Sequence, residues 1–275
     1  MKVNLYGKGF VGGEFVKAFP DTVVNDRDDI MPKTPKILYT ISTVDNYNVK
    51  EDPYLDINTN LTLLIETLEA CRLFYDNDFE FNFCSSWFAY GATDYPARED
   101  SYCDPKGFYS ITKRTAEQLL ISYCETYDIK YRILRLANIL GVSDQKVSKK
   151  KNYLQYAIRQ LVNRETVTLY EGDLIRDFID VRDAVQAINL VMENGELNSI
   201  YNIGSGRPFS VVKLILHVWK FLMRGGISRI PIPEFHQQVQ VADFYLDTKK
   251  LSSLGFVPQH NIYDTVKEIA SFYAS

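Results

Sequence analysis

A glycine-rich segment near the start of the chain sets the strongest limit on its fold. The sequence Gly7-Lys8-Gly9-Phe10-Val11-Gly12 follows a short apolar segment at residues 2–6 and leads into a helical apolar pattern at residues 10–19. A buried strand, a glycine turn and a helix in this order are typical of the start of a βαβ unit. The spacing G-x-G-x-x-G permits a tight turn and lets backbone N–H groups approach a pyrophosphate at the helix N-terminus. We therefore expect a dinucleotide at Gly7, Gly9, Phe10, Val11 and Gly12.

Further apolar segments alternate with helical patterns along the chain. Strands are expected at residues 23–24, 37–41, 79–84 and 130–136, and helices at residues 61–74 and 112–127. Parallel strands need crossover connections, which are usually helices. The pattern therefore predicts an α/β fold of the Rossmann type with a doubly wound parallel sheet.

The pattern loosens after residue 140. Short strands are expected at residues 167–170, 178–181 and 201–203, and a helix at residues 211–223. We expect a dinucleotide-binding domain over residues 1–140, to which residues 176–203 return, and a smaller, mainly substrate-binding C-terminal lobe over residues 141–275. The basic run at residues 146–151 is interpreted as a solvated loop rather than as a phosphate site.

Composition argues against several classes of protein. The 31 Lys and Arg residues against 35 Asp and Glu give a net charge of −4, so no bulk field gathers nucleic acid or an anionic membrane. The three histidines are scattered, and we expect neither a metal site nor a histidine triad. The four cysteines form no C-x-x-C pair, and the sequence shows neither a signal-peptide pattern nor the roughly 18 apolar residues of a membrane helix. These features favour reduced thiols and a cytoplasmic location.

Residues that follow the second and third strands bear on the choice of cofactor. Asp26 lies about 20 residues after the glycine turn, where a carboxylate accepts hydrogen bonds from ribose hydroxyls. Arg27 could instead pair with a 2′-phosphate, so NAD is favoured and NADP stays possible. Ile41 and Ser42, at the end of the strand at residues 37–41 and just beyond it, are expected on the same cofactor.

Tyr109 and Lys113 stand four residues apart, which places them on one face of a helix. A free phenol titrates near 10, and a nearby ammonium together with an oxidised nicotinamide favours the phenolate. The spacing alone carries little weight, because it recurs three times elsewhere in the chain. Only Tyr109 begins a helix after a strand that ends in serines, at the carboxyl edge where ligands bind in α/β sheets. We therefore expect a catalytic relay of Ser86, Tyr109 and Lys113.

Several segments, in order along almost the whole chain, resemble the extended short-chain dehydrogenase/reductase family of NAD-dependent nucleotide-sugar epimerases and dehydratases. They are residues 52–60, 64–71, 83–91 (FCSSWFAYG), 135–141 (RLANILG), 172–183 with RDFIDV, and 201–206 (YNIGSG). The resemblance places the catalytic serine on Ser86 and implies a cofactor contact for Asn60. It also implies that Asn138 and Arg176 meet the substrate diphosphate. Trp87, beside Ser86, is expected to contact the substrate.

The chain departs from the family in informative places. The glycine turn is one residue shorter than the family's T-G-x-x-G-x-x-G, and a strand and helix that normally follow Asp26 are missing, so we expect an open adenine pocket. Where the dehydratases carry Asp-Glu after the catalytic serine, this chain has Trp87-Phe88, which cannot transfer protons and disfavour dehydration. The cysteine of the 3,5-epimerase/reductases is absent at position 87. A late arginine that holds the diphosphate in several epimerases is replaced near residues 236–238.

The favoured hypothesis is a nucleotide-sugar 4-epimerase that acts by transient hydride transfer on a nucleotide-diphosphate sugar. In it Tyr109 takes a hydroxyl proton, Ser86 bonds the reacting oxygen and Lys113 holds the nicotinamide ribose. An NADPH-dependent reductase or dehydrogenase of the same family, and a non-catalytic dinucleotide-sensing module, stay open. The helices at residues 61–74 and 112–127 could pair in a homodimer, although packing on their own sheet explains their apolar stripes equally well.

Overall fold

The computed structural model describes residues 2–26, 29–144, 147–148, 150–232, 234 and 243–275. Its main sheet has six parallel strands in the order β10-β5-β4-β3-β1-β2. The strands are β1 (Val3–Tyr6), β2 (Val23–Val24), β3 (Lys36–Tyr39), β4 (Glu80–Ser86), β5 (Lys130–Leu136) and β10 (Ser199–Ile203). Each overlaps a strand expected from the sequence, and the parallel doubly wound sheet is confirmed.

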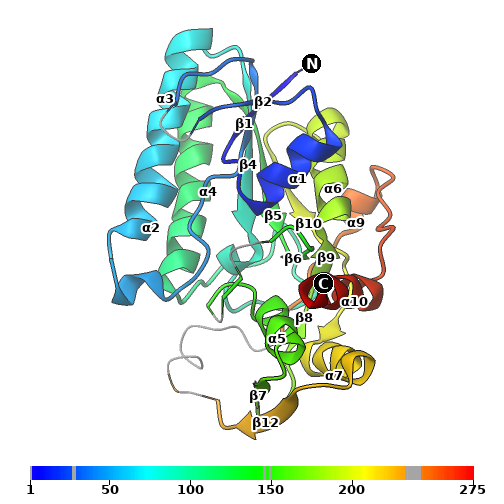
Figure 1. Ribbon diagram of the computed structural model, residues 1–275. Helices are drawn as coiled ribbons and strands as arrows, with labels where there is room; N and C mark the ends of the chain where they lie inside the picture. Colours follow the sequence, from blue (N-terminus) through cyan, green and yellow to red (C-terminus); the bar gives the residue numbers. More distant parts are fainter. Residues whose placement is uncertain (1, 27–28, 145–146, 149, 233, 235–242) are drawn as a thin grey trace.

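Helices cover both faces of this sheet (Figure 1). The helices α1 (Phe10–Ala18) and α6 (Val181–Asn194) pack on one face, and α3 (Leu63–Tyr75) and α4 (Phe108–Tyr127) on the other. Successive side chains of a strand point to opposite faces of the sheet. Leu5 therefore packs in the core beneath α1 and α6, and Tyr6 in the core beneath α3 and α4. Both faces are buried, and polar side chains within the strands, such as Asn4 and Asn82, are hydrogen-bonded there.

A second lobe lies below the main sheet in Figure 1 and has its own core. The helices α5 (Tyr153–Val162), α7 (Val211–Leu222) and α10 (Ile262–Ala274) pack there with the parallel strands β7 (Thr166–Tyr170) and β12 (Gly226–Ile230). Two further strand pairs are β6 (Asn138–Leu140) with β9 (Phe178–Asp180), and β8 (Ile175–Arg176) with β11 (Phe209–Ser210). The C-terminal half of the chain therefore builds this core and also supplies α6 and β10 to the main sheet.

The main sheet ends at β2, and the described residues between β2 and β3 hold no further strand or helix. The Asn25 side chain donates hydrogen bonds to the carbonyls of Asp29 and Met31, at 2.8 and 2.7 Å. The Lys33 N–H donates to the Asn4 Oδ1 at 2.6 Å. These bonds hold a short connection against β1, where the family resemblance leads one to expect a strand and a helix. The segment that the sequence lacks after Asp26 therefore makes the main sheet shorter at its β2 edge.

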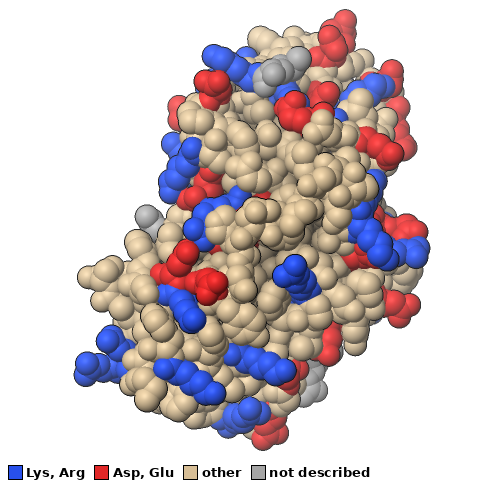
Figure 2. Space-filling model, turned by 90° about the vertical axis from the view of Figure 1, so that its right-hand side faces the viewer, with Lys and Arg blue, Asp and Glu red and all other residues tan. Residues whose placement is uncertain are grey.

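Charged side chains are unevenly distributed over the face shown in Figure 2. Lys and Arg predominate on its lower part, and Asp and Glu are more frequent on its upper part. Residues 197–233 contain no acidic residue, which contributes to the difference. Along the described residues, no helix is both long and apolar enough to cross a membrane. The four cysteines are free thiols.

Candidate active site

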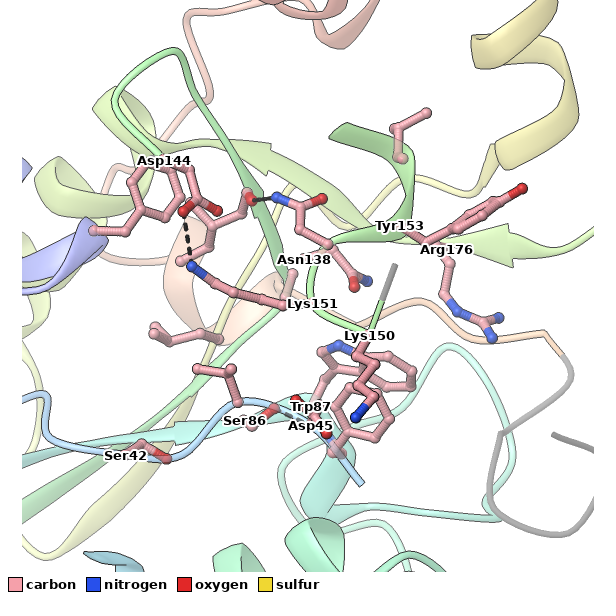
Figure 3. A pocket seen from close by; sticks show the side chains of 18 of the residues that line it. Ser42, Asp45, Ser86, Trp87, Asn138, Asp144, Lys150, Lys151, Tyr153 and Arg176 are labelled. Carbon is pink, nitrogen blue, oxygen red and sulfur yellow. Dashed lines mark hydrogen bonds and ion pairs between the residues drawn. The ribbon is translucent and has the colours of Figure 1, made fainter. Parts of the chain in front are cut away.

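A cavity of about 1110 Å³ lies between the carboxyl ends of the main-sheet strands and the second lobe. Its walls come from the glycine turn, the segments that follow β3 and β4, the start of α4 and the loop before α5. Figure 3 shows side chains from both parts of the molecule that point into it. The cavity exceeds the roughly 300–1,000 Å³ of a single small-molecule site, so it has room for a cofactor and a second ligand.

The glycine turn has the geometry of a phosphate-binding turn. Gly7 has a φ of +97°, and a Cβ there would approach the backbone nitrogen of Ile41 to 2.8 Å. A Cβ on Gly12 would lie 2.2 Å from the Gly7 carbonyl oxygen, whereas Gly9 has open space around it and precedes the first turn of α1. Gly9, Phe10, Val11 and Gly12 line the cavity. The first and third glycines therefore serve close backbone packing, and the second leaves room for a pyrophosphate at the helix N-terminus.

Some residues expected at the cofactor do not reach the cavity. Gly7 and Ile41 pack beneath the turn, and Asp26 is exposed after β2 without lining the cavity. Arg27 lies outside the described residues, as does the segment 236–238 in which the late arginine is replaced. The open adenine pocket stays a prediction, because Asp26 lies outside the cavity and Arg27 outside the described residues.

Asn60 acts from behind the cavity wall. It is buried in a π-helical turn at Asn58–Thr62 and does not line the cavity. Its Oδ1 accepts hydrogen bonds from the Ser42 hydroxyl at 3.1 Å and the Thr43 N–H at 3.0 Å. Its Nδ2 donates to the Thr112 Oγ1 at 3.1 Å. Asn60 thus ties Ser42, which does line the cavity, to the helix that carries Tyr109.

Ser86, Tyr109 and Lys113 meet at the cavity wall. Ser86 ends β4, Tyr109 and Lys113 lie on successive turns of α4, and all three line the cavity. The hydroxyls of Ser86 and Ser42 are hydrogen-bond partners of the Tyr109 phenol. The Lys113 Nζ donates to the Cys84 carbonyl at 3.0 Å and lies 4.2 Å from the centre of the Phe83 ring. The structure therefore brings together the three residues that the sequence singles out.

Burial controls the protonation of the two titratable groups. It raises the pKa of Tyr109, and it outweighs the hydrogen bonds with Ser86 and Ser42, which act in the opposite direction. The carboxylates of Asp56 and Asp45 raise the Tyr109 pKa further. Burial also lowers the pKa of Lys113 to about 8. The protein alone thus favours the neutral phenol, in spite of the ammonium one turn along the helix.

The start of α4 depends on Asn46, which the sequence analysis did not single out. The helix begins at Phe108, earlier than the expected residue 112, and Gly107 precedes it without a side-chain cap. The Asn46 Oδ1 accepts hydrogen bonds from the N–H and the hydroxyl of Ser110, at 3.0 and 3.1 Å. A Cβ on Gly107 would lie 2.1 Å from the Asn46 Cγ. Asn46 therefore caps the helix from another part of the chain, and Gly107 leaves the space for it.

The three residues expected on the substrate side also line the cavity. Trp87 packs against Phe88 and Phe244, with ring centres 4.0 and 4.7 Å apart, and the Arg176 guanidinium lies 5.4 Å from its ring. Burial lowers the pKa of Arg176 to about 10. The Asn138 Nδ2 donates to the Asp177 carbonyl at 3.0 Å. Trp87, Asn138 and Arg176 therefore form one continuous part of the wall from β4, β6 and β8.

The end of the basic run faces the cavity as well (Figure 3). The Lys151 Nζ pairs with the buried carboxylate of Asp144 at 2.7 Å, and Lys150 pairs with the exposed Glu51. Lys150 is exposed, as expected of a solvated loop, whereas Lys151 is half-buried and its ammonium is held at the cavity wall. Their position depends on how the second lobe folds over the sheet, which no local pattern reveals.

A buried carboxylate explains the turn at residues 201–206. Asp177 accepts hydrogen bonds from the N–H and hydroxyl of Ser205 and from the N–H groups of Gly206 and Leu246, at 2.7 to 3.3 Å. A Cβ on Gly204 would lie 2.7 Å from the Asp177 Oδ2. The sequence YNIGSG therefore wraps a carboxylate next to Arg176, and its role is to hold the cavity wall.

Comparisons with known proteins agree with this geometry. The model of the NAD dependent epimerase/dehydratase family matches residues 25–204. A Methanocaldococcus jannaschii protein that has been assigned the name UDP-glucose 4-epimerase is 29% identical over 238 residues, which span 86% of this chain and 76% of the relative.

Solved structures show the same fold. A Thermotoga maritima UDP-glucose 4-epimerase with UDP-glucose superposes with a TM-score of 0.87 at 20% identity, over 99% of this chain and 98% of that one. A Thermus thermophilus UDP-glucose 4-epimerase with NAD gives a TM-score of 0.85 at 20% identity, over 99% of each chain. With a family model matched over more than half of its length, the chain belongs to the NAD dependent epimerase/dehydratase family.

Proposed function

We propose that this protein is a nucleotide-sugar epimerase of the 4-epimerase type that uses NAD. The observation that carries the proposal is the Tyr109 phenol, which lies with Ser86 and Ser42 in the same cavity as a glycine turn suited to a pyrophosphate. The M. jannaschii relative's name and the UDP-glucose bound by the T. maritima structure support the same substrate class. The reaction needs no further protein group beyond those on this wall.

Each residue of the wall has a defined task in this proposal. Bound NAD supplies reversible hydride transfer, and return of the hydride to the opposite face of the oxidised carbon inverts that carbon. Tyr109 accepts the proton of the reacting hydroxyl and later returns it, and Ser86 donates a hydrogen bond to the reacting oxygen. Lys113 binds a ribose hydroxyl of the cofactor, and its charge favours the phenolate.

The substrate diphosphate is assigned to the cationic side of the cavity. Arg176, Lys150 and Lys151 reach the cavity from the second lobe and its loop, and Asn138 adds an amide. A guanidinium and ammonium groups suit phosphate oxygens as partners. Trp87 stands where a dehydratase carries an acid, so this position offers no proton to a leaving hydroxyl, which disfavours dehydration and leaves redox epimerisation or reduction.

The direct test is to incubate the full-length protein and NAD with UDP-glucose, UDP-galactose and their N-acetyl analogues, and to separate the isomers by chromatography. We expect one isomer pair to interconvert without net consumption of cofactor, and Tyr109→Phe to abolish the interconversion while cofactor binding persists. Net oxidation of NADPH would identify a reductase instead. Full activity of Tyr109→Phe would exclude the assigned mechanism.

We further propose a homodimer formed through α3 and α4. Their outer surface exposes large apolar side chains, namely Leu73, Phe74, Leu119 and Tyr127. Apolar side chains gathered on the outside of paired helices suit a symmetric contact. Light scattering after gel filtration tests this, and a monomer at micromolar concentration would reject it.

The free thiols support a reducing, cytoplasmic location.

A division into two functional parts also belongs to this proposal. The cofactor lies on residues 1–140 with the returning segment 176–203, and the remaining residues of 141–275 mainly bind substrate.

The choice between NAD and NADP follows from a titration with each, read by quenching of the tryptophan fluorescence. Tighter binding of NAD is expected, because Asp26 is exposed at the edge of the cofactor site and opposes a 2′-phosphate.

A further inference from the structure

One carboxylate stands at the reactive end of the cavity and has no task in the mechanism above. Asp45 follows β3 and lines the same cavity as Ser86 and Trp87 (Figure 3). Its Oδ1 accepts a hydrogen bond from the Tyr47 N–H at 2.7 Å, which fixes the side chain in a local turn. Asp45 lies near enough to Tyr109 for its charge to raise the phenol pKa. It is therefore a carboxylate fixed in the cavity wall, with a charge that reaches the Tyr109 phenol.

The charges at this end of the cavity are mixed, because the Lys113 ammonium lines it beside Tyr109 together with Asp45. A second carboxylate, Asp56, is fully buried, accepts a hydrogen bond from the Asn48 Nδ2 at 2.9 Å, and also raises the Tyr109 pKa. The charge of Lys150 acts on Asp45, but Lys150 is itself paired with Glu51. Elsewhere in the cavity the acids Glu14 and Asp144 are each paired with a lysine of the same wall.

The geometry of inversion brings both edges of the sugar ring past this group. When a C4 hydroxyl lies at Tyr109, the neighbouring carbons carry the C3 hydroxyl on one edge and the C6 substituent on the other. A ring that presents its opposite face to the same cofactor exchanges these two edges. With Asp45 assigned to one edge of the ring, a substituent on C6 faces it in one of the two poses, whichever pose comes first.

We propose that Asp45 is a specificity-determining residue that selects neutral hexoses and excludes uronic acids. Its carboxylate accepts hydrogen bonds from sugar hydroxyls, whereas a C6 carboxylate meets it as a like charge in one of the two poses. The inference rests on the proposed function and deepens it, because it assigns the sugar class. Asp56, buried behind this end of the cavity, adds to the same negative field.

The test compares UDP-glucose with UDP-glucuronate for wild type and Asp45→Asn at pH 8, with epimerisation measured by chromatography. Asparagine keeps the local turn, since its amide oxygen accepts the same N–H, and removes only the charge. We expect wild type to prefer UDP-glucose, and Asp45→Asn to raise the ratio of kcat/KM for UDP-glucuronate over UDP-glucose on the order of tenfold. Glu171→Gln, which removes a charge from the second-lobe wall of the same cavity, should leave that ratio near the wild-type value.

The outcomes separate the two levels of the proposal. Wild-type activity on no nucleotide sugar would reject the proposed function itself. Wild-type activity on UDP-glucose with an unchanged ratio in Asp45→Asn, or with an equal shift in Glu171→Gln, would overturn the role of Asp45 alone. A wild-type preference for UDP-glucuronate would overturn it as well.

Discussion

Arg135 and Glu117 form a bidentate ion pair in which both side chains are buried. The Arg135 Nε and Nη2 donate to the two carboxylate oxygens of Glu117, at 3.0 and 2.8 Å. Glu117 lies on α4 and Arg135 on β5, and the Ser85 hydroxyl on β4 donates to the same carboxylate at 2.6 Å. The pair thus joins the helix of Tyr109 to β5, and the Ser85 bond joins the same helix to β4, the strand that ends at Ser86.

Removing one partner of this pair should be strongly destabilising. Glu117→Ala leaves the Arg135 charge buried without a counter-ion, and we expect the free energy of unfolding to fall by about 3–5 kcal/mol. Urea unfolding followed by circular dichroism measures the change. Asp100→Ala is the matched control, because its ion pair with Arg98 is exposed and should contribute less than about 1 kcal/mol. Equal small losses in both variants would show that the buried pair does not hold α4.

The cap on α4 should matter for activity as well as for stability. Asn46→Ala removes the acceptor for the Ser110 N–H, at an expected cost of about 1 kcal/mol in unfolding free energy. Because Tyr109 lies in the same first turn, we also expect kcat to fall more than KM changes. Asn46→Asp keeps an acceptor oxygen and should restore most of kcat. Wild-type kcat in Asn46→Ala would contradict the positioning role.

The parts of the site that the sequence predicts are those encoded by neighbouring residues. The turn from Gly7 to Gly12 and the end of β4 at Ser86 each follow from a strand and the residues directly after it. Asn46 caps a helix 64 residues further along the chain, so no local pattern reveals it.

Tertiary placement also decides what the basic run and Asn60 do. Lys151 is typical of a solvated loop until the second lobe brings it against the buried Asp144. Asn60 resembles a cofactor ligand, yet the structure directs its side chain to Ser42, Thr43 and Thr112. Residue type indicated polar contacts in both cases, but the partner of Lys151 is fixed by the fold of its own loop and the partners of Asn60 by the packing of distant segments.

Ser42 should set the pH at which the enzyme becomes active. Its hydroxyl lowers the pKa of the Tyr109 phenol against the effect of burial by turning its proton from Asn60 to the phenolate. The phenolate is the active form, so activity rises with pH and Ser42→Ala should move this rise to higher pH. We expect a roughly threefold to tenfold lower kcat at neutral pH, by loss of one hydrogen bond of about 1 kcal/mol. Ser42→Thr keeps the hydroxyl and should restore the profile, whereas a loss that is equal at every pH would reject this role.

Lys113 should make the folded protein less stable, because its role in the active site requires a buried ammonium. Burial lowers its pKa to about 8 from an ordinary value near 10.5, so the folded protein binds this proton less tightly than the unfolded chain does. The sign follows from linkage: the lysine destabilises the fold below pH 8, and the loss disappears as the pH rises from about 8 to 10.5. Lys113→Met should therefore raise the unfolding free energy by about 1–3 kcal/mol at pH 7, although it gives up the hydrogen bond to Cys84.

Urea unfolding of wild type and Lys113→Met between pH 7 and 10 measures this difference directly. The unfolding free energy of Lys113→Met should exceed that of wild type by less and less as the pH rises. Its epimerase activity should be lost at every pH. Lys130→Met, at an exposed lysine, controls for the general effect of pH and should show no such trend. A variant less stable than wild type at pH 7 would mean that the Cys84 bond and the Phe83 ring compensate fully for burial of the charge.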